Sequence, residues 1–177
     1  SLIGVFFILP SLMDKIFAPI AYPADKVVIG SRDHLRRTVL RYRHLPGYPR
    51  VFARMKIMMD PMFRELHKYV KNPRRIIDIG CGFGVPATWL LEIYPDARVF
   101  GIEPDVERVL IASRVIGSRG RVEAGRAPDL PHVEGEADHV LMLDMLHLIS
   151  DDEVKIVFQR IYDKLTADGT LLIRTTI

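Results

Sequence analysis

A glycine-rich loop between two acidic residues is the part of this sequence whose residue types could bind a small molecule. Asp78 precedes Gly80, Gly82 and Gly84, and Glu103 follows Gly84 by 19 residues. Glycines let the backbone turn sharply and let a ligand approach the main chain closely. A carboxylate at the position of Glu103 can accept hydrogen bonds from both hydroxyls of a ribose. The spacing therefore predicts a site for a ligand that contains a nucleoside.

Two classes of nucleotide ligand fit such a loop. Residues 82–87 formally match the G-x-G-x-x-G/A pattern of dinucleotide sites. In that alignment the pattern begins after Gly80 has already ended the strand, and Pro86 removes one of the amide donors that a pyrophosphate would use. Asp78 distinguishes the two classes, because a carboxylate before the loop repels a pyrophosphate but suits a ligand that carries an ammonium and a sulfonium. An NAD-dependent oxidoreductase therefore remains the less favoured alternative.

The loop needs strands and helices that bring its residues to one edge of a sheet. From Arg75 onward, short apolar strands alternate with helices. The expected strands cover residues 76–79, 98–103, 121–124, 138–143 and 170–176, and the expected helices cover residues 86–93, 105–116 and 150–165. This alternation predicts a parallel sheet that helices cover on both faces. Ligands of such sheets bind beyond the carboxyl ends of the strands, which is where Asp78 and Glu103 stand.

These segments resemble the class I S-adenosylmethionine-dependent methyltransferases over about residues 75–177. Residues 77–84 look like the cofactor loop of that family, and residues 102–104 resemble its ribose-binding motif. Residues 138–148 are similar to its fourth strand and the loop after it, and residues 165–173 resemble its turn into the fifth strand. The resemblance implies a doubly wound, Rossmann-like parallel sheet of order 3-2-1-4-5. It also implies a methyltransferase that uses S-adenosylmethionine and releases S-adenosylhomocysteine.

The same resemblance implies a set of cofactor-binding residues, in which Asp78 holds the amino group and Glu103 the ribose. Arg126 stands where the family usually has an acid that binds the adenine amine. Arginine can stack on adenine but cannot accept that hydrogen bond, and the backbone of Ala127 could still serve the ring nitrogen. The whole expected set is Asp78, Gly80, Cys81, Gly82, Gly84, Glu103, Pro104, Arg126, Ala127, Asp144 and Met145.

The sequence assigns no catalytic residue. Methyl transfer needs alignment of the nucleophile, the methyl carbon and the sulfonium more than it needs acid–base help. A neutral His147 could accept a proton from a hydroxyl or amine, or it could simply line the pocket. Cys81 lies inside the glycine loop and is expected to pack there rather than act as a nucleophile. No spacing of His, Cys, Asp and Glu indicates a metal site.

The chain ahead of the sheet differs from the rest in charge. Residues 1–75 carry 15 Lys/Arg and 5 Asp/Glu, a net charge of +10, whereas residues 76–177 carry 10 and 17, a net charge of −7. Such a split indicates two parts with different roles. Residues 14–72 are predicted to form a helical preface, and residues 73–177 the cofactor-binding core. The basic residues of the preface form either a solvated helical face or a surface that meets an anionic membrane.

Three helices are expected in the preface, beginning near Ser31, near Val51 and at Pro61. The middle helix has an apolar stripe, which predicts core packing. The stripe consists of Val51, Phe52, Met55, Met58 and Met59. The family resemblance implies that the preface folds over the cofactor as a lid. The candidates to face the acceptor pocket are Tyr42, His44 and Tyr48, for which packing at the surface is the alternative.

An apolar run, Leu2–Leu9, opens the sequence and ends at Pro10. Eight residues are too few for a membrane span, which needs about 20. Residues 1–13 are therefore interpreted either as the cytoplasmic end of a longer membrane helix or as a segment buried in the fold or against a second copy. Together with the +10 net charge of residues 1–75, the run predicts a cytoplasmic protein that contacts the anionic face of a membrane.

The acceptor of the methyl group is not visible in the sequence, so an unidentified small-molecule or lipid-like acceptor is expected. Nucleic acid is disfavoured, because no basic groove with interleaved aromatic residues and no Asn-Pro-Pro-Tyr-type motif is present. The single cysteine cannot form an intramolecular disulfide. A non-catalytic docking domain of a larger membrane protein remains an alternative, because Arg126 departs from the family pattern and the sequence stops in the fifth of the family's seven strands. A homodimer also remains open.

Overall fold

A computed structural model describes residues 27–45 and 47–175 of the chain. Its centre is a five-stranded sheet of order β3-β2-β1-β4-β5 in which all four pairs of neighbours are parallel. The strands are β1 (Arg75–Ile79), β2 (Arg98–Glu103), β3 (Gly120–Ala124), β4 (Ala137–Leu143) and β5 (Leu165–Arg174). The doubly wound α/β fold and its strand order, as expected from the sequence, are confirmed.

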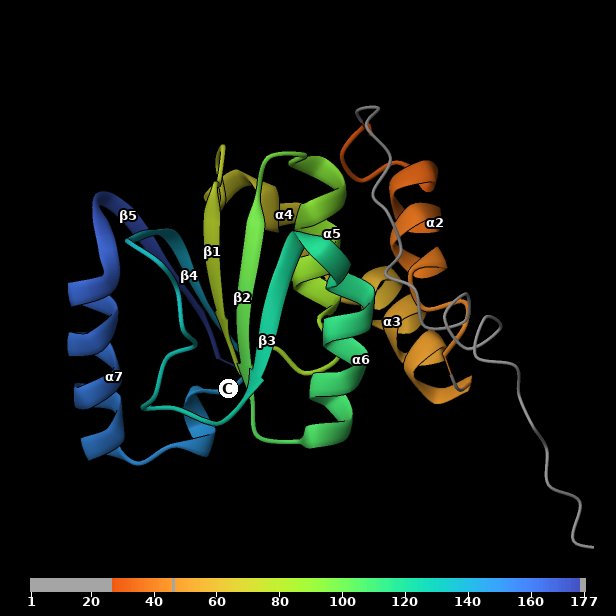
Figure 1. Cartoon of the computed structure of the whole chain (residues 1–177). Coiled ribbons are helices and arrows are strands. Elements are labelled where there is room, and N and C mark those ends of the chain that lie inside the picture. Colours follow the sequence, from red (N-terminus) through yellow and green to blue (C-terminus); the bar gives the residue numbers. More distant parts are fainter. Residues whose placement is uncertain (1–26, 46, 176–177) are drawn as a thin grey trace, which may run out of the picture.

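Helices cover both faces of the sheet (Figure 1). On one face lie α5 (Val85–Ile93) and α6 (Val106–Ile116), and on the other lies α7 (Asp151–Lys164). Three further helices, α2 (Arg32–Leu40), α3 (Gly47–Met59) and α4 (Met62–Tyr69), pack against α5. Two short 3₁₀ turns, η1 (Gly117–Arg119) and η2 (Leu146–Leu148), complete the described elements. The helices of the preface thus pack on the face of the sheet that carries α5, the helix that follows the glycine loop.

The boundaries of the core elements follow local sequence chemistry. β1 is buried on both sides, with Ile76, Ile77 and Ile79 fully inaccessible, as expected for the central strand of a covered parallel sheet. Asp105 caps α6 by accepting hydrogen bonds from the amides of the next turn. Ser150 and Glu153 form a capping box at the start of α7. These signals explain why the alternation of strands and helices was predictable.

The helix α3 meets the core with a different face from the one that the sequence pattern indicates. Its buried residues are Pro49, Ala53 and Ile57. Of the predicted inward stripe, Phe52 is half-buried, and the others, Val51, Met55, Met58 and Met59, are exposed. The prediction of core packing for the methionines is therefore wrong. The helix has apolar residues on two sides, and periodicity alone does not say which side a neighbour will cover.

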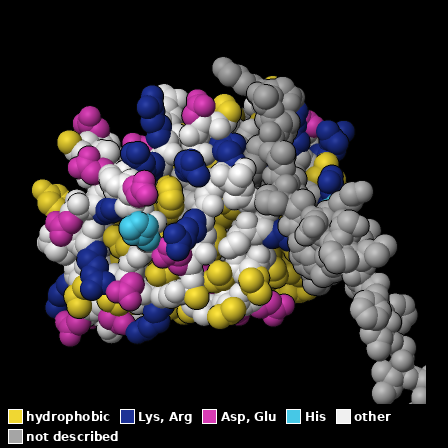
Figure 2. Space-filling view, in the orientation of Figure 1, with side chains coloured by type: hydrophobic (Ala, Val, Ile, Leu, Met, Phe, Trp, Pro, Cys, Tyr) yellow, Lys and Arg dark blue, Asp and Glu magenta, His cyan; other side chains and the backbone are white. Residues whose placement is uncertain are grey.

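The start of α6 shows the same kind of correction. Helical periodicity predicts an inward side made of Val106, Val109, Leu110 and Ala112. In the structure only Val109 and Ala112 are buried, and Val106 and Leu110 are exposed. In Figure 2 hydrophobic side chains gather along the lower edge of the face shown, where α6 begins in Figure 1. On the face shown, apolar side chains therefore lie at the end of the molecule at which the strands terminate.

The helix α2 is fixed to α5 by buried polar contacts. His34 Nδ1 accepts a hydrogen bond from the Gly30 amide at 3.1 Å, so its Nε2 donates to the Trp89 carbonyl at 2.9 Å. Burial lowers the pKa of His34 to about 4, which keeps the ring neutral at physiological pH. Arg41 forms an ion pair with Glu92 at 2.8 Å, and both side chains are almost completely buried. These contacts hold the preface in one orientation on the core.

Among residues 27–45 and 47–175, no helix combines the length and apolar character that crossing a membrane requires. The apolar run of residues 2–9 and the first part of the predicted preface lie outside the described residues.

Candidate functional site

The glycine loop leaves β1 in a left-handed backbone conformation. Gly80, Gly82 and Gly84 have φ angles of +72°, +54° and +73°, which L side chains rarely adopt. A Cβ at Gly80 would lie 3.1 Å from Met145 Cβ, whereas a Cβ at Gly82 would meet nothing within 4 Å. The loop is therefore packed against the protein at Gly80 and faces open space at Gly82.

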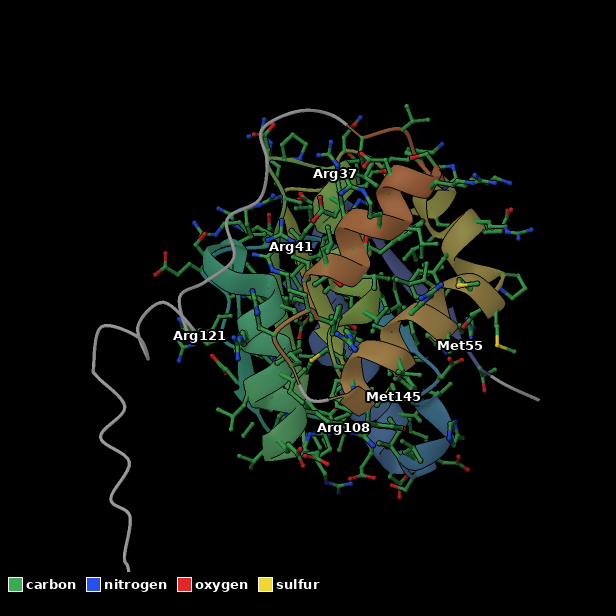
Figure 3. The ribbon with its side chains drawn as sticks, turned by 90° about the vertical axis from the view of Figure 1, so that its right-hand side faces the viewer. Arg37, Arg41, Met55, Arg108, Arg121 and Met145 are labelled. Atoms are coloured by element: carbon green, nitrogen blue, oxygen red, sulfur yellow. The ribbon has the colours of Figure 1, made fainter. Side chains whose placement is uncertain are left out.

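Two cavities open beside this loop at the carboxyl ends of the strands, each of about 260 Å³. The first, called here the aromatic cavity, lies between the loop and α3 and includes Tyr48, Phe52 and Phe83. The second, called the Glu103 cavity, lies between the loop and the residues that follow β2, β3 and β4. Both are lined by the same five residues of the loop and its surroundings: Gly80, Gly82, Arg108, Leu143 and Asp144. Figure 3 shows Arg108 and Met145 together at this end of the molecule.

The structure brings ten of the eleven expected cofactor-binding residues to these two cavities. Asp78 and Cys81 line the aromatic cavity, and most of the others line the Glu103 cavity. Gly84 does not line either one, because it packs against α6, where a Cβ would lie 3.3 Å from Ala112 Cβ. Gly84 thus serves the close approach of the loop to α6.

Asp78 is a buried carboxylic acid with an unused acceptor. Its side chain is almost inaccessible, and among the described residues its Oδ2 has no hydrogen-bond partner. Burial and, second, the nearby charge of Glu103 together raise the pKa of Asp78 to about 7. Buried polar atoms normally have partners, so this oxygen indicates a place for a ligand group that donates hydrogen bonds or carries positive charge.

Glu103 joins β2 to the glycine loop. Its Oε2 accepts from the Gly82 amide at 2.9 Å, and its Oε1 accepts from the Asp105 amide at 3.2 Å. An ionised carboxylate offers about four lone-pair sites, so two remain for a ligand. The cap of α6 is Asp105, not Glu103. Glu103 therefore holds the loop and still has acceptors that face the cavity.

Cys81 packs inside the loop. Its side chain is buried against Gly101, where an added Cβ would lie 2.9 Å from Cys81 Sγ. Burial raises the pKa of the Cys81 thiol far above its ordinary value, and the charges of Asp78 and Glu103 add to this effect. A thiol that stays protonated is a poor nucleophile, which agrees with the packing role expected from the sequence.

Asp144 belongs to an ionic network that the sequence did not reveal. Its carboxylate accepts from Arg174 at 2.7 and 2.6 Å and from Lys56 at 3.2 Å. Arg174 also binds both carboxylate oxygens of Asp60 at 2.7 Å, and Lys56 lies 2.9 Å from Asp60. The network ties α3 and the start of α4 to the ends of β4 and β5. Asp144 therefore lines both cavities with a carboxylate that already has two basic partners.

Arg126 lines one of the cavities, whereas His147 lines neither of them. The exposed guanidinium of Arg126 lines the Glu103 cavity but donates to Glu153 of α7 at 2.5 Å. Ala127 is buried beside it. His147 is exposed on η2 and is not among the residues that line either cavity. The geometry therefore gives no support to His147 as a general base.

The wall of the aromatic cavity comes from the preface and from the loop itself. The ring centroids of Phe52 and Phe83 lie 5.3 Å apart, and that of Tyr48 lies 6.0 Å from Phe83. The Arg108 guanidinium lies 5.5 Å from the Phe83 centroid. Behind the loop, the Tyr42 hydroxyl donates to the Phe83 carbonyl at 3.0 Å. Of the three candidates in the preface, Tyr48 thus faces the cavity and Tyr42 supports it.

The remaining candidate, His44, is exposed and lies outside both cavities. Sequence reasoning missed Phe52, Phe83, Arg108 and Lys56. Phe83 could have been found, because it stands inside the glycine loop. Within the described part of the chain, no group of three or more His, Cys, Asp or Glu side chains could hold a metal ion.

Comparison with known proteins agrees with this geometry. A family model described as a methyltransferase domain matches residues 76–169, more than half of the chain. Malonyl-[acyl-carrier protein] O-methyltransferase of Legionella pneumophila is 26% identical over 135 residues, which are 75% of this chain and 47% of that protein. Ajmaline N-methyltransferase of Rauvolfia serpentina is 30% identical over 108 residues, 58% of this chain and 36% of that protein.

Solved structures show the same fold. A plantazolicin methyltransferase in complex with S-adenosylhomocysteine aligns with a TM-score of 0.55 at 17% identity, over 78% of this chain and 57% of that one. The chain spans less than half the length of either curated relative. The family model matches from β1 to the start of β5 and includes the glycine loop and Glu103. It confirms the resemblance seen in the sequence, and the chain belongs to the methyltransferase domain family.

Proposed function

We propose that this protein transfers a methyl group from S-adenosylmethionine to an acceptor and releases S-adenosylhomocysteine. The observation that carries the proposal is the placement of two buried carboxylates, Asp78 and Glu103, on either side of the open space at Gly82. Membership of the methyltransferase domain family supports it, as does the S-adenosylhomocysteine bound in a relative of the same fold.

The residues present fit this cofactor at both of its polar ends. The unpartnered Oδ2 of Asp78 suits the ammonium of the methionine part, and the remaining acceptors of Glu103 suit the ribose hydroxyls. Gly82 leaves the room that the ligand needs. Pro104, Arg126, Ala127 and Met145 surround the side of the Glu103 cavity on which the adenine would lie. When bound, S-adenosylmethionine supplies an electrophilic methyl group.

The aromatic cavity is the proposed place of the acceptor. Tyr48, Phe52 and Phe83 form an apolar wall that excludes water and holds a largely apolar molecule. Positioning of two reactants can by itself lower a reaction barrier by about 7–11 kcal/mol. Lys56 and Asp144 line this cavity but neutralise each other in the ionic network. The chain's own contribution is therefore alignment, and the proposed acceptor is a small-molecule or lipid-like nucleophile.

The basic residues of the preface favour association of this protein with a membrane surface. Residues 27–75 contain 13 Lys/Arg and 3 Asp/Glu. Several basic residues near an anionic bilayer can hold a protein there, because each contributes about 1 kcal/mol. The proposal therefore includes contact with the anionic, cytoplasmic face of a membrane, for which the preface supplies the charge.

Thermal unfolding in the presence of candidate ligands tests the cofactor assignment. A ligand that binds only the folded state raises the melting temperature in proportion to its binding free energy. We expect S-adenosylhomocysteine to raise the melting temperature, and NAD to leave it unchanged. A rise with NAD and none with S-adenosylhomocysteine would overturn the proposal in favour of an oxidoreductase. A non-catalytic docking domain would bind S-adenosylhomocysteine yet methylate no acceptor in a panel of amphiphilic alcohols, acids and amines.

A further inference from the structure

The outer face of α3 presents apolar side chains to solvent. Val51, Met55, Met58 and Met59 are 56%, 45%, 50% and 70% exposed. Their spacing places them on one stripe of the helix, and we call these four residues the α3 stripe. Figure 3 labels Met55 on this helix. Contiguous apolar side chains at the surface of a folded protein mark sites of interaction.

Basic side chains flank the α3 stripe. Arg50 and Arg54 lie one turn apart along one border of it, and both are exposed. The helix contains no acidic residue. Within residues 27–45 and 47–175, no acidic side chain forms an ion pair with either arginine. Two guanidinium groups are therefore available to an external anion beside an apolar surface.

We propose that the α3 stripe and its two arginines dock on a bilayer that contains anionic phospholipid. A helix with an apolar face and basic residues beside it is the pattern of a segment that lies in the membrane interface. Methionine side chains suit this role, because their flexible thioethers adapt to an irregular apolar environment. The inference rests on the proposed membrane contact and names the surface that makes it. It does not depend on methyl transfer.

Charge argues for lipid over a second copy of this chain as the occupant. A symmetric dimer through the α3 stripe would bring Arg50 and Arg54 of both copies together at one interface. Like charges that face each other across an interface oppose association, whereas anionic headgroups would neutralise all of them. An adjacent face of the same helix supplies Tyr48, Phe52 and Lys56 to the aromatic cavity. Docking through α3 would therefore place the bilayer next to the proposed acceptor site.

Vesicle co-sedimentation tests the proposal with variants that leave both cavities intact. The full chain is incubated with phosphatidylcholine vesicles that contain phosphatidylserine, or with phosphatidylcholine alone. We expect binding only to the anionic vesicles and a decrease with added salt. The double variant Arg50→Glu/Arg54→Glu should bind at least about 30-fold more weakly, since each lost base contributes about 1 kcal/mol and the two new carboxylates are repelled by the anionic lipid. The double variant Lys155→Glu/Arg160→Glu on α7 changes the net charge equally and should bind as the wild type does.

A site-specific probe reports whether the stripe itself enters the lipid. Met55 on α3 and Ile156 on α7 are both 45% exposed, so Met55→Cys and Ile156→Cys form a matched pair for an environment-sensitive fluorophore. The native Cys81 does not compete for the label, because it is buried and burial raises the pKa of its thiol. We expect a blue shift on anionic vesicles for the probe at position 55 and none at position 156.

Each other outcome overturns a defined part of the account. Binding that persists in Arg50→Glu/Arg54→Glu, with no shift at position 55, would move the membrane contact away from α3. Absence of binding to anionic vesicles would remove both the α3 surface and the proposed membrane contact, whereas binding of S-adenosylhomocysteine would be unaffected. A concentration-dependent dimer that Met55→Ser abolishes, without vesicle binding, would assign the stripe to a second copy.

Discussion

The ionisation of Asp78 couples the proposed cofactor to pH. The folded protein raises the pKa of this carboxyl from its ordinary value of 3.8 to about 7 by burial, with Glu103 as the second cause. Stability from the protonated acid is therefore fully present below pH 3.8 and is lost as the pH rises through about 7. A bound ammonium favours the carboxylate and lowers that pKa again, so binding releases a proton.

It follows that the affinity for S-adenosylhomocysteine rises as the pH rises through 7. We expect calorimetric titrations to show tighter binding at about pH 8 than at about pH 6. Asp78→Asn keeps the size of the side chain and removes the charge, so it should weaken binding by about 1–3 kcal/mol and abolish this pH dependence. Equal pH dependence in the wild type and Asp78→Asn would exclude Asp78 as the partner of the amino group.

Gly82 has a left-handed backbone conformation and open space beside it. A substitution there, compared with one at Gly30, distinguishes backbone strain from loss of the space that the ligand needs. Gly82→Val should abolish binding of S-adenosylhomocysteine, because the new side chain would project into the space beside the loop. A non-glycine residue in this conformation costs about 1–2 kcal/mol. Gly30→Val has a similar conformational cost, because Gly30 has a φ of +72° and a Cβ there would also meet nothing within 4 Å. Gly30 lies outside both cavities, so this variant is the control. Loss of binding in both variants would indicate general unfolding.

At the scale of elements, the attachment of α2 to α5 determines how the preface covers the site. Arg41 and Glu92 are paired at 2.8 Å with almost no exposure. Arg41→Met would leave the Glu92 carboxylate buried without this partner, which costs about 3–5 kcal/mol of stability. The double variant Arg41→Met/Glu92→Met should recover much of that loss in chemical denaturation. If the double variant were no more stable than Arg41→Met, the ion pair would not be the source of the effect.

The sequence predicts where the helices begin better than which face of each helix is buried. The start of α7 agrees with the helix expected from residue 150, because its capping box depends only on Ser150 and Glu153, which are three positions apart. The face that α3 buries depends on α5, which only the folded chain brings next to it. Pro49, Ala53 and Ile57 pack inward, while the more conspicuous methionines remain outside. The α3 stripe was therefore visible as a pattern, but its direction was not.

The site was partly predictable for the same reason. Asp78, Gly80 and Gly82 are neighbours in the sequence, and parallel strands bring Glu103 to the same edge. The ionic network of Lys56, Asp60, Asp144 and Arg174 joins segments that are far apart along the chain. No local pattern announces such a network. The network forms between the two cavities and the start of α4 because the fold pairs the ends of β4 and β5 with each other.

At the scale of the whole molecule, both cavities lie at the carboxyl ends of the strands, and α3 of the preface forms one wall of the aromatic cavity. The two cavities share the glycine loop, so a cofactor held by Glu103 in one and by Asp78 in the other would extend past Gly82 into the aromatic cavity. The aromatic wall belongs to α3 and the loop, and the outer side of α3 carries the α3 stripe. The proposed acceptor site and the proposed lipid surface thus involve adjacent faces of one helix.

Calorimetric titration with S-adenosylhomocysteine, comparing the wild type with Glu103→Gln, tests the central claim most directly. Glu123→Gln is the matched control, because Glu123 stands near the same end of the adjacent strand and also accepts a backbone hydrogen bond, from the His132 amide. We expect one bound ligand per chain, binding that is weaker by about 1–3 kcal/mol in Glu103→Gln, and wild-type affinity in Glu123→Gln. Glutamine can accept only one of the two backbone hydrogen bonds that Glu103 accepts, so the melting temperature of Glu103→Gln should fall, and its unfolding curve checks that it is folded at the titration temperature. A wild-type protein that binds no S-adenosylhomocysteine, or a folded Glu103→Gln variant that binds it as tightly as the wild type, would contradict the account.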